Sequence, residues 1–588
     1  MPSPSRQTAS DDLVKSGFGS IKWLFFLQIG SRLITFGLNT AIARTVPQST
    51  FAIANLQIQL LLNIILPLSR EAFRRAILRA PLDPHADDYR LRSEKLLNFS
   101  YLSLPLGVLL SVVITVGFLL TSTFEELRTP GYREAIQWVG VAGLVEMLSE
   151  PLYIIAQHRL MFGVRAAIEL VGIALKSLFS FLLVVHFGMG LQAFGVVTLI
   201  YCSVVSLGYW LYFGLLSPLP EFPTISSLLP HRIAVKDRSD TARGVTITRL
   251  SWSESLDVDL SRYLATFEWQ TLQKMLLQEG EKILLRGAET LDNQGIFALV
   301  NVLGSLVVRF VFAWLEEGLF PLFSKLLVQA LALPEDDPTR RNLLRKSSVI
   351  LVLLSKLMCY IGLLFACFGP AYSYLLLDLL YTSKYSQTTA PQFLAWYCVY
   401  ILAMALNGIT EAFAHSAAST RVLNYFNIAM VAQSLLLVAA TLVFLHFGFA
   451  AAVIMSNCLV MATRIVLSIG FIKGFFNDNL KTTQLKNEAR MTTKTMRTTS
   501  EATEKTPQFL ISSLFPHPII LTTFAISYIV TRISESNLCS IETGTSIVGC
   551  GQHISVAIFC LLLNAASAIW IERPYFKSLY QFVRTRDV

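Results

Sequence analysis

Charged residues are scarce in this sequence of 588 residues. Asp, Glu, Lys and Arg together make up 15% of the chain, whereas a soluble domain carries about 25%. Hydrophobic residues make up 53%, and the mean hydropathy is +0.55. A chain of this composition cannot cover a water-exposed surface with polar groups. The composition therefore excludes an ordinary soluble protein and favours one that folds in lipid.

The motifs of soluble catalysis are also missing. The sequence contains no P-loop, no HExxH and no GxSxG. None of its eight cysteines has CxxC spacing, and no histidine cluster accompanies them. We therefore expect a transporter and not an enzyme, with no metal and no cofactor. The net charge of +9 is expected beside anionic membrane lipid and not at a nucleic-acid surface.

Long apolar segments dominate what is present. A helix needs about 20 predominantly apolar residues to cross a bilayer. Fourteen such segments are predicted, at 20–45, 50–69, 96–121, 135–157, 165–187, 190–214, 264–287, 294–324, 347–369, 390–414, 422–446, 449–472, 515–533 and 552–572. The segment 264–287 is the weakest because it contains charged residues, among them Lys274, Glu279, Glu281 and Lys282. The sequence predicts an all-α polytopic membrane protein with about 14 transmembrane helices.

The distribution of basic residues orients these segments. With a cytosolic N-terminus and fourteen crossings, 35 of the 48 Lys and Arg residues fall on the cytosolic side and 6 on the opposite side. Short cytosolic loops are rich in Lys and Arg in membrane proteins generally. The layout therefore predicts that both termini are cytosolic.

Two hydrophilic segments divide the chain. The sequence predicts an N-lobe at 1–216 with spans 1–6, and a cytosolic linker at 217–262. It then predicts a C-lobe at 263–473 with spans 7–12, and a disordered cytosolic linker at 474–513 that is rich in Thr and Lys. The last two spans and the C-terminal tail occupy 514–588. Two lobes of six helices around a central cavity are typical of transporters that alternate access.

Ionisable and amide side chains inside the spans are expensive in lipid and point to function. Helical spacing places several of them in polar stripes, which predicts a hydrated central cavity that binds an anionic head group such as a phosphate. The residues predicted to bind this anion are Arg32, Asn39, Lys176, Lys282, Arg309 and Arg464. Arg32 is the strongest candidate, because the polar neighbours on its own helix face are uncharged.

Other charged residues allow two interpretations each. Arg70, Glu71, Arg74 and Arg75 follow the second span, and they form either a positive-inside anchor or a gate that captures a head group. A further set provides either coupling carboxylates or structural ion pairs: Glu146, Glu150, Glu281, Glu316, Glu317 and Glu411. Cys539 and Cys550 share one predicted luminal loop, and they are either inert thiols or a disulfide.

Five sequence strings resemble one eukaryotic family. They are LQIGSRLITFGLNTAIAR (27–44), SREAFRRAILR (69–79), EGEKILLRGAETLDNQGIFALVNVLGSLVVRFVFAWLEEGLF (279–320), LNGITEAFAHSAAS (406–419) and SNCLVMATRI (456–465). The family comprises endoplasmic-reticulum (ER) proteins proposed to translocate Man5GlcNAc2-PP-dolichol for protein N-glycosylation. It lies within the superfamily of multidrug/oligosaccharidyl-lipid/polysaccharide exporters.

The resemblance implies a fold of two six-helix lobes plus two helices, an ER membrane location and a dolichyl-diphosphate oligosaccharide as substrate. It implies importance for Arg32, Arg70, Glu71, Arg74, Arg75, Glu281, Arg309, Glu316 and Glu317. Two alternatives to a flippase stay open. One is a non-transport accessory or chaperone that works with other proteins of the ER glycosylation pathway. The other, less favoured, is an ion-coupled multidrug antiporter, since such antiporters usually need an acidic cavity where this chain carries Arg32.

Overall fold

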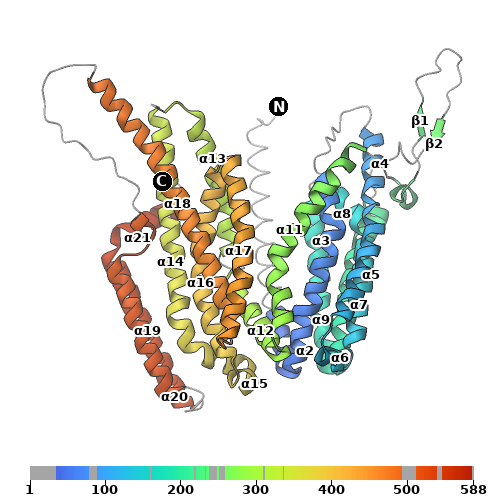
Figure 1. Ribbon diagram of the computed structural model, residues 1–588, viewed down its shortest axis with the longest axis horizontal. Helices are drawn as coiled ribbons and strands as arrows, with labels where there is room; N and C mark the ends of the chain where they lie inside the picture. Colours follow the sequence, from blue (N-terminus) through green and yellow to red (C-terminus); the bar gives the residue numbers. More distant parts are fainter. Residues whose placement is uncertain are drawn as a thin grey trace, which may run out of the picture. The chain divides into compact units, whose positions relative to one another are not determined.

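The structure is a computed structural model of the whole chain. It describes residues 35–77, 89–158, 161–217, 220, 222–231, 234–236, 248–250, 258–308, 312–335, 337–492, 511–539 and 546–585. The described residues are almost entirely helical (Figure 1). They form two compact units, Met1–Gly295 (unit 1) and Ile296–Val588 (unit 2).

Unit 1 is a bundle in which α3 packs against α5, α7 and α11, while α10 packs against α7 and α9. Residues 35–45 are helical. The helices that follow are α2 (Gln48–Ala52), α3 (Ile58–Ile77), α4 (Tyr89–Ser100), α5 (Ser103–Leu120), α6 (Phe124–Arg128), α7 (Tyr132–Met147), α8 (Glu150–His158), α9 (Phe162–Phe181), α10 (Leu191–Leu211) and α11 (Val258–Ala288). Single π-helical turns lie at η1 (Ile53–Gln57), η2 (Leu182–His186) and η3 (Tyr212–Leu216).

The junction of α7 and α8 bends by 48°. Pro151 lacks an N–H, and it follows the break by a few residues, which is the usual cause of such a kink. The indole N–H of Trp210 donates to the carbonyl of Leu148 at the break, at 3.0 Å. The carbonyl of Leu148 therefore has a side-chain partner at the bend.

Part of the predicted linker at 217–262 packs on unit 1. The 3₁₀ turn η4 (Ile225–Leu228) follows Phe222, and the side chains of Phe222 and Leu228 are buried in a cluster with Leu97 and Tyr209. The Asn98 side chain donates to the carbonyl of His231 at 2.8 Å and accepts from its N–H at 3.1 Å.

Beyond this turn, β1 (Ala234–Lys236) and β2 (Thr248–Leu250) pair antiparallel, with Ala234 opposite Leu250. They are the only strands in the described part of the chain. The predicted linker is therefore partly ordered structure.

Unit 2 is built around the long helix α14, which packs against α13, α16 and α19. Its helices are the end of α12 (Leu291–Val307), then α13 (Ala313–Ala332), α14 (Pro338–Tyr381), α15 (Ser383–Ser386), α16 (Ala390–Ala417), α17 (Thr420–His446), α18 (Ala452–Thr492), α19 (Pro518–Leu538), α20 (Ile547–Ile571) and α21 (Arg573–Thr585), with a 3₁₀ turn at η7 (Ile511–Leu514).

Two boundaries differ from those the sequence predicts. The helix α18 continues to Thr492, so the segment predicted as a disordered linker at 474–513 begins as helix. Its residues there include Lys, Gln, Leu, Glu and Ala, which favour helix. The helix α11, assigned to the C-lobe by its order in the chain, packs against α3 in unit 1. The predicted lobe boundary at 263 was drawn by counting membrane spans along the chain, and it stays a prediction.

The predicted membrane spans agree closely with the described helices. Within the described residues, nine helices are long and apolar enough to cross a membrane, and the bent pair α7 and α8 makes a tenth if it is one span. All ten fall on predicted spans, so the chain is a multi-pass membrane protein. The remaining four predicted spans are 20–45, 264–287, 294–324 and 515–533, and the total of fourteen is therefore not confirmed. The first of these lies mostly outside the described residues, and α11 carries charges that lower its hydropathy.

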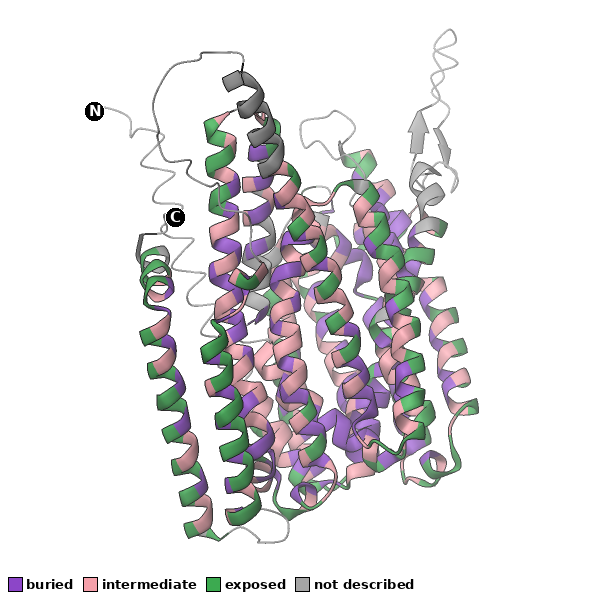
Figure 2. Cartoon of the chain, turned by 60° about the vertical axis from the view of Figure 1, so that its left-hand side comes forward, coloured by how far each residue is buried: buried purple, intermediate pink, exposed green. Residues whose placement is uncertain are grey.

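Large apolar side chains are exposed along the faces of the helices. Figure 2 shows how exposed and buried residues alternate around the helices. On α20, Phe559 is 68% exposed, Leu562 63% and Trp570 71%. Such faces are unfavourable in water and favourable against lipid chains.

Glycine allows α14 and α16 to approach closely. A Cβ atom on Gly362 would lie 2.8 Å from the Cα of Leu402. Small residues at helix contacts are typical of membrane bundles, where close packing replaces the hydrophobic effect. We expect Gly362→Ala to lower the free energy of unfolding by about 1–3 kcal/mol, because the helices must separate.

Gly470 on α18 provides the matched control, because no atom lies within 4 Å of the position of its Cβ. The substitution Gly470→Ala should raise the free energy of unfolding by about 0.5–1 kcal/mol through helix propensity alone. Denaturant titration of both variants in detergent micelles checks the opposite signs. A loss at Gly470 equal to that at Gly362 would contradict the packing argument.

Candidate functional site

Two arginines of α3 are paired with two glutamates across the bend in unit 1. We name these four residues the α3 ion-pair cluster. Arg70 Nη1 lies 2.7 Å from Glu146 Oε1. Arg74 binds Glu150 through two hydrogen bonds, Nε to Oε1 at 2.5 Å and Nη2 to Oε2 at 2.7 Å. The Glu150 side chain is 0% exposed. A two-pronged arginine–carboxylate contact of this kind is geometrically specific and strong.

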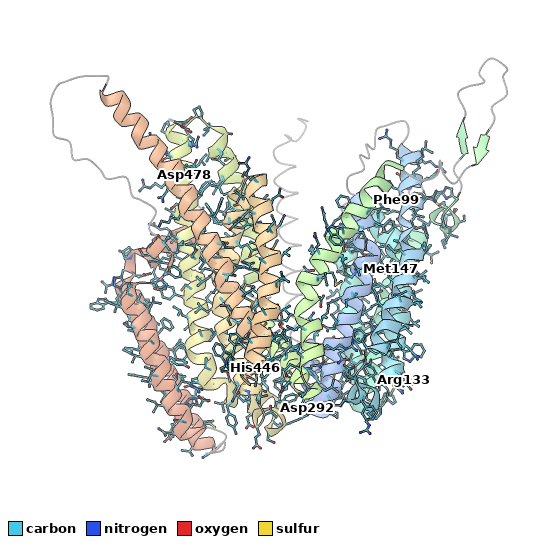
Figure 3. The ribbon with its side chains drawn as sticks, in the orientation of Figure 1. Phe99, Arg133, Met147, Asp292, His446 and Asp478 are labelled. Carbon is cyan, nitrogen blue, oxygen red and sulfur yellow. The ribbon has the colours of Figure 1, made fainter. Side chains whose placement is uncertain are left out.

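The spacing of the sequence places these groups. Arg70 and Arg74 lie one turn apart on α3, and Met147, labelled in Figure 3, ends α7 immediately after Glu146. The Cys202 thiol donates to Glu146 Oε2 at 3.2 Å. Two of the three arginines of the predicted anchor or gate, Arg70 and Arg74, therefore have carboxylate partners on α7 and α8. Arg75 pairs with Glu71 on the same helix at 3.2 Å, in a half-exposed position.

Two further cations lie beside this cluster on α9. The guanidinium of Arg165 lies 4.4 Å from the centre of the Tyr153 ring, and the guanidinium of Arg74 lies 3.6 Å from it. Lys176 lies on the same face of α9, three turns from Arg165, with its Nζ 5.5 Å from the centre of the Tyr201 ring.

Neither Arg165 nor Lys176 is in an ion pair with any residue that the structure describes, and the buried Nε of Arg165 has no hydrogen-bond partner there. Residue Glu169 lies between them on the helix. Aromatic faces stabilise a cation without neutralising its charge. These two cations are therefore better placed to bind an added anion than the paired arginines are.

The predicted first span carries Arg32, Thr35 and Asn39 as a polar stripe on one helix face, and this stripe reaches α9. Thr35 Oγ1 lies 3.3 Å from Ser177 Oγ, next to Lys176. Asn39, one turn further along that stripe, is half-buried on the helical segment 35–45. The predicted residues Arg32 and Arg309 lie outside the described residues, as do the side chains of Glu316 and Glu317 on α13. Glu281 is half-buried on α11.

A second buried network lies around Glu126, which is 1% exposed. We name it the Glu126 network, and it comprises Glu126, Arg286, Gln57 and Gln294. Arg286 Nε lies 3.3 Å from Glu126 Oε1, and Gln57 donates to the same oxygen at 2.7 Å. Gln57 also donates to Gln294 Oε1 at 3.0 Å. These contacts within unit 1 join α6 to η1, to α11 and to the first turn of α12.

The sequence did not reveal this network, because Glu126 lies in a predicted loop and Arg286 lies at the end of the predicted span 264–287. The one local signal is the pattern Thr123-x-x-Glu126, a capping box in which the Thr123 N–H donates to Glu126 Oε2 at 2.8 Å. The partner Arg286 is distant in sequence. Lys282, predicted to bind a diphosphate, pairs instead with Glu279 on its own helix at 2.7 Å, and Asn63 donates to that glutamate at 2.9 Å.

Unit 2 contains an open pocket between α16, α17 and α18. It encloses about 290 Å³ of empty space, part of it open to the surroundings, and Glu411, His415, Gln433 and Arg464 contribute its polar lining. Asn407 donates to Glu411 at 2.5 Å, and His415 Nε2 lies 3.4 Å from the same carboxylate. Arg464 Nε donates to the Gln433 amide oxygen at 3.2 Å.

Arg464 thus lines the pocket with only an amide as its hydrogen-bond partner among the described residues. A guanidinium in that situation keeps its charge available for an anion. Of the predicted diphosphate ligands that the structure describes, Lys176 in unit 1 and Arg464 in unit 2 therefore suit that role best.

A third carboxylate fastens the C-terminal helices to α14. Glu572 accepts from Lys356 Nζ at 2.8 Å, from the Tyr360 hydroxyl at 3.1 Å and from the His517 N–H at 2.9 Å. This carboxylate is buried. Three donors and the charge of Lys356 satisfy this carboxylate, which favours a structural role.

Comparison with known proteins covers nearly the whole chain. A family model described as Rft protein matches residues 16–582. A relative from Dictyostelium discoideum is 34% identical over 455 residues, which is 74% of this chain and 82% of the relative. A relative from Mus musculus is 28% identical over 569 residues, which is 95% of this chain and 94% of the relative. Each of these relatives is named Man(5)GlcNAc(2)-PP-dolichol translocation protein RFT1.

Solved structures of low sequence identity share the fold. An inward-facing multidrug resistance MATE family transporter of the MOP superfamily aligns with a TM-score of 0.52 and 12% identity, over 74% of this chain and 93% of its own. The lipid II flippase MurJ in an inward closed conformation aligns with a TM-score of 0.50 and 10% identity, over 93% of this chain and 98% of its own. The fold is therefore that of this group of membrane transporters.

Proposed function

Since the chain belongs to the Rft protein family, we propose that it translocates a dolichyl-diphosphate-linked, mannose-rich oligosaccharide across the ER membrane for protein N-glycosylation. The observation that carries the proposal is the family match over residues 16–582. In addition, relatives named as translocation proteins align with this chain over almost their full length. In this proposal the protein is a transporter and not an enzyme, and both of its termini are cytosolic.

The physical problem of such a reaction is the diphosphate. Moving an uncompensated charged group into hydrocarbon costs tens of kcal/mol by Born arguments, so the protein must supply cations along the path. Lys176 and Arg165 on α9 and Arg464 in the pocket of unit 2 are suited to this, because the structure shows no carboxylate paired with them among the described residues. Arg32 and Arg309 join them on sequence grounds alone.

The remaining residues of the predicted site take different roles in this proposal. Arg70, Arg74, Glu146 and Glu150 hold unit 1 in shape, because each already has an opposite charge close by. Glu411 with His415 provides a carboxylate beside an ionisable imidazole in the pocket. That pair is the best candidate for coupling transport to a proton. The polyprenyl tail of the substrate stays in lipid against the apolar outer faces of the helices.

The proposal predicts that Lys176→Gln lowers transport about tenfold or more, because a hydrogen bond to a charged group contributes about 1.5–3 kcal/mol. The measurement is movement of labelled dolichyl-diphosphate oligosaccharide across vesicles that contain the purified protein. Arg32→Gln should show a similar loss. Lys577→Gln, the same exchange on the exposed side of α21, should leave the rate unchanged.

Two results would contradict the proposal in different ways. Equal transport by the wild type and Lys176→Gln would remove that lysine from the path. Absence of movement with folded wild-type protein that restores glycosylation in cells would favour the accessory role, in which other proteins of the ER glycosylation pathway move the lipid.

A further inference from the structure

Two cysteines lie together where the last two long helices meet. Cys539 immediately follows α19, and Cys550 lies in the first turn of α20. Their sulfur atoms are 3.1 Å apart. Cys539 is 1% exposed, and Cys550 is half-buried. Since a disulfide bond is about 2.05 Å long, the two sulfurs need only a small side-chain movement to bond.

The backbone and not the choice of rotamer holds these residues together. Gly549 precedes Cys550, and a Cβ on it would lie 2.6 Å from the carbonyl oxygen of Leu538, which precedes Cys539. The two chain segments are therefore in direct contact immediately before each cysteine. Only glycine at 549 permits this approach without displacing Leu538.

A hydrogen bond also joins α19 and α20, about one turn farther from their connection. The imidazole of His553 on α20 is 0% exposed, and its Nδ1 lies 2.8 Å from the Ser534 hydroxyl of α19. Its Nε2 lies 3.0 Å from the carbonyl of Ala371. Because a carbonyl only accepts, Nε2 carries the proton and Nδ1 accepts from Ser534. The ring of Tyr372 stacks on the imidazole, with 4.1 Å between ring centres.

The predicted topology places the α19–α20 connection on the side opposite the cytosol. Under the proposed function, on which this inference rests, that side is the ER lumen. The lumen is an oxidising compartment in which disulfides form and persist. The other six cysteines lie within helices of the predicted spans, and none of them is in that loop.

We propose that Cys539 and Cys550 form a disulfide in the ER lumen that joins the luminal ends of α19 and α20. The oxidant is a protein disulfide of the lumen. The more exposed Cys550 attacks it and forms a mixed disulfide. Cys539 then attacks the Cys550 sulfur and releases the oxidant as a dithiol. The two cysteines lose two electrons and two protons, and the oxidant gains both.

Burial determines the order of these steps. A protein oxidant cannot reach a thiol that is 1% exposed, so the mixed disulfide forms at Cys550. Burial also raises the pKa of the Cys539 thiol to about 12. Cys539 is therefore protonated during the first step, and it gives up this proton as it attacks the mixed disulfide at the Cys550 sulfur.

The test uses the full-length protein in ER membranes. Free thiols are first blocked in denaturant with N-ethylmaleimide, disulfides are then reduced, and the released thiols are labelled with a maleimide-polyethylene glycol. We expect two labels on the wild type and none on Cys539→Ser or Cys550→Ser. Two labels on both single variants, or no label on the wild type, would overturn the proposal.

A matched pair of glycine variants tests the geometry while keeping both cysteines. Gly549→Val should make the bond reducible at a several-fold lower concentration of dithiothreitol, because the new side chain pushes Leu538 away. Gly551→Val is the control, because no atom lies within 4 Å of the position of its Cβ. It should reduce at the wild-type concentration. An equal shift in both variants would overturn the assignment.

Thiol accessibility separates this proposal from the function on which it rests. In sealed vesicles, labelling of Cys550 by a membrane-impermeant maleimide from the cytosolic side would overturn the luminal placement of this loop. Labelling of both cysteines by a permeant maleimide without prior reduction, in vesicles that still transport the lipid, would overturn the disulfide and leave the proposed function standing.

Discussion

Replacing Glu150 with glutamine should lower the free energy of unfolding by about 3–5 kcal/mol, because it leaves Arg74, whose side chain is only 13% exposed, without its opposite charge. Arg74 binds this carboxylate through two hydrogen bonds, and Arg70 lies 3.7 Å from it. The Glu150 side chain is 0% exposed, so water cannot take over its role. Denaturant titration of the purified protein in detergent micelles measures the loss.

The control for this substitution lies on the same surface of unit 1. Glu71 is 33% exposed and pairs with Arg75 along one helix, so Glu71→Gln should cost less than about 1 kcal/mol. The double variant Arg74→Met with Glu150→Met removes both charges and should recover most of the loss. A double variant as unstable as Glu150→Gln would show that shape and not charge dominates at this position.

Glu126→Gln should be similarly harmful, with a loss of about 3–5 kcal/mol. The amide can still accept from Gln57, but it cannot neutralise Arg286, which is only 12% exposed. The result to compare is that of Glu125→Gln on the neighbouring residue, which is exposed. That variant should change the free energy of unfolding by less than about 0.5 kcal/mol.

We expect Glu126→Gln also to weaken the attachment of α11 to the rest of unit 1. The Glu126 network holds this helix against the α5–α6 connection, and Arg286 also donates to the carbonyl of Phe118 at 3.2 Å. Limited proteolysis between α11 and α12 should therefore become faster in Glu126→Gln and stay unchanged in Glu125→Gln. Equal protection in both variants would show that apolar packing alone holds α11 in place.

The fold follows from the sequence to the extent that lipid dictates it. Each span such as 390–414 or 422–446 is recognisable alone, because a lipid-exposed helix must be apolar along its whole length. The helix α11 shows where this logic ends. Its charged residues Glu279 and Lys282 form an ion pair with each other. A hydropathy scale counts each charge separately, so it does not predict that this helix is stable in the membrane.

The site was less predictable than the fold. Residue type and helical spacing singled out Arg70, Arg74, Glu146 and Glu150, but the spacing within one helix cannot reveal which arginine meets which glutamate across two helices. Arg165 is the first residue of the predicted span 165–187, and its contact with the Tyr153 ring emerged only from the packing of α9. Tertiary contacts between residues distant in sequence decide which cations stay available.

The bend between α7 and α8 has a mechanical consequence. Glu146 precedes the break and Glu150 follows it, and both form ion pairs with arginines on the same face of α3. A change in the bend angle moves one carboxylate relative to the other, so at least one of the two ion pairs must lengthen. The ion pairs therefore oppose any change in the bend angle. We expect α7, α8 and α3 to move together as one rigid body whenever unit 1 changes shape.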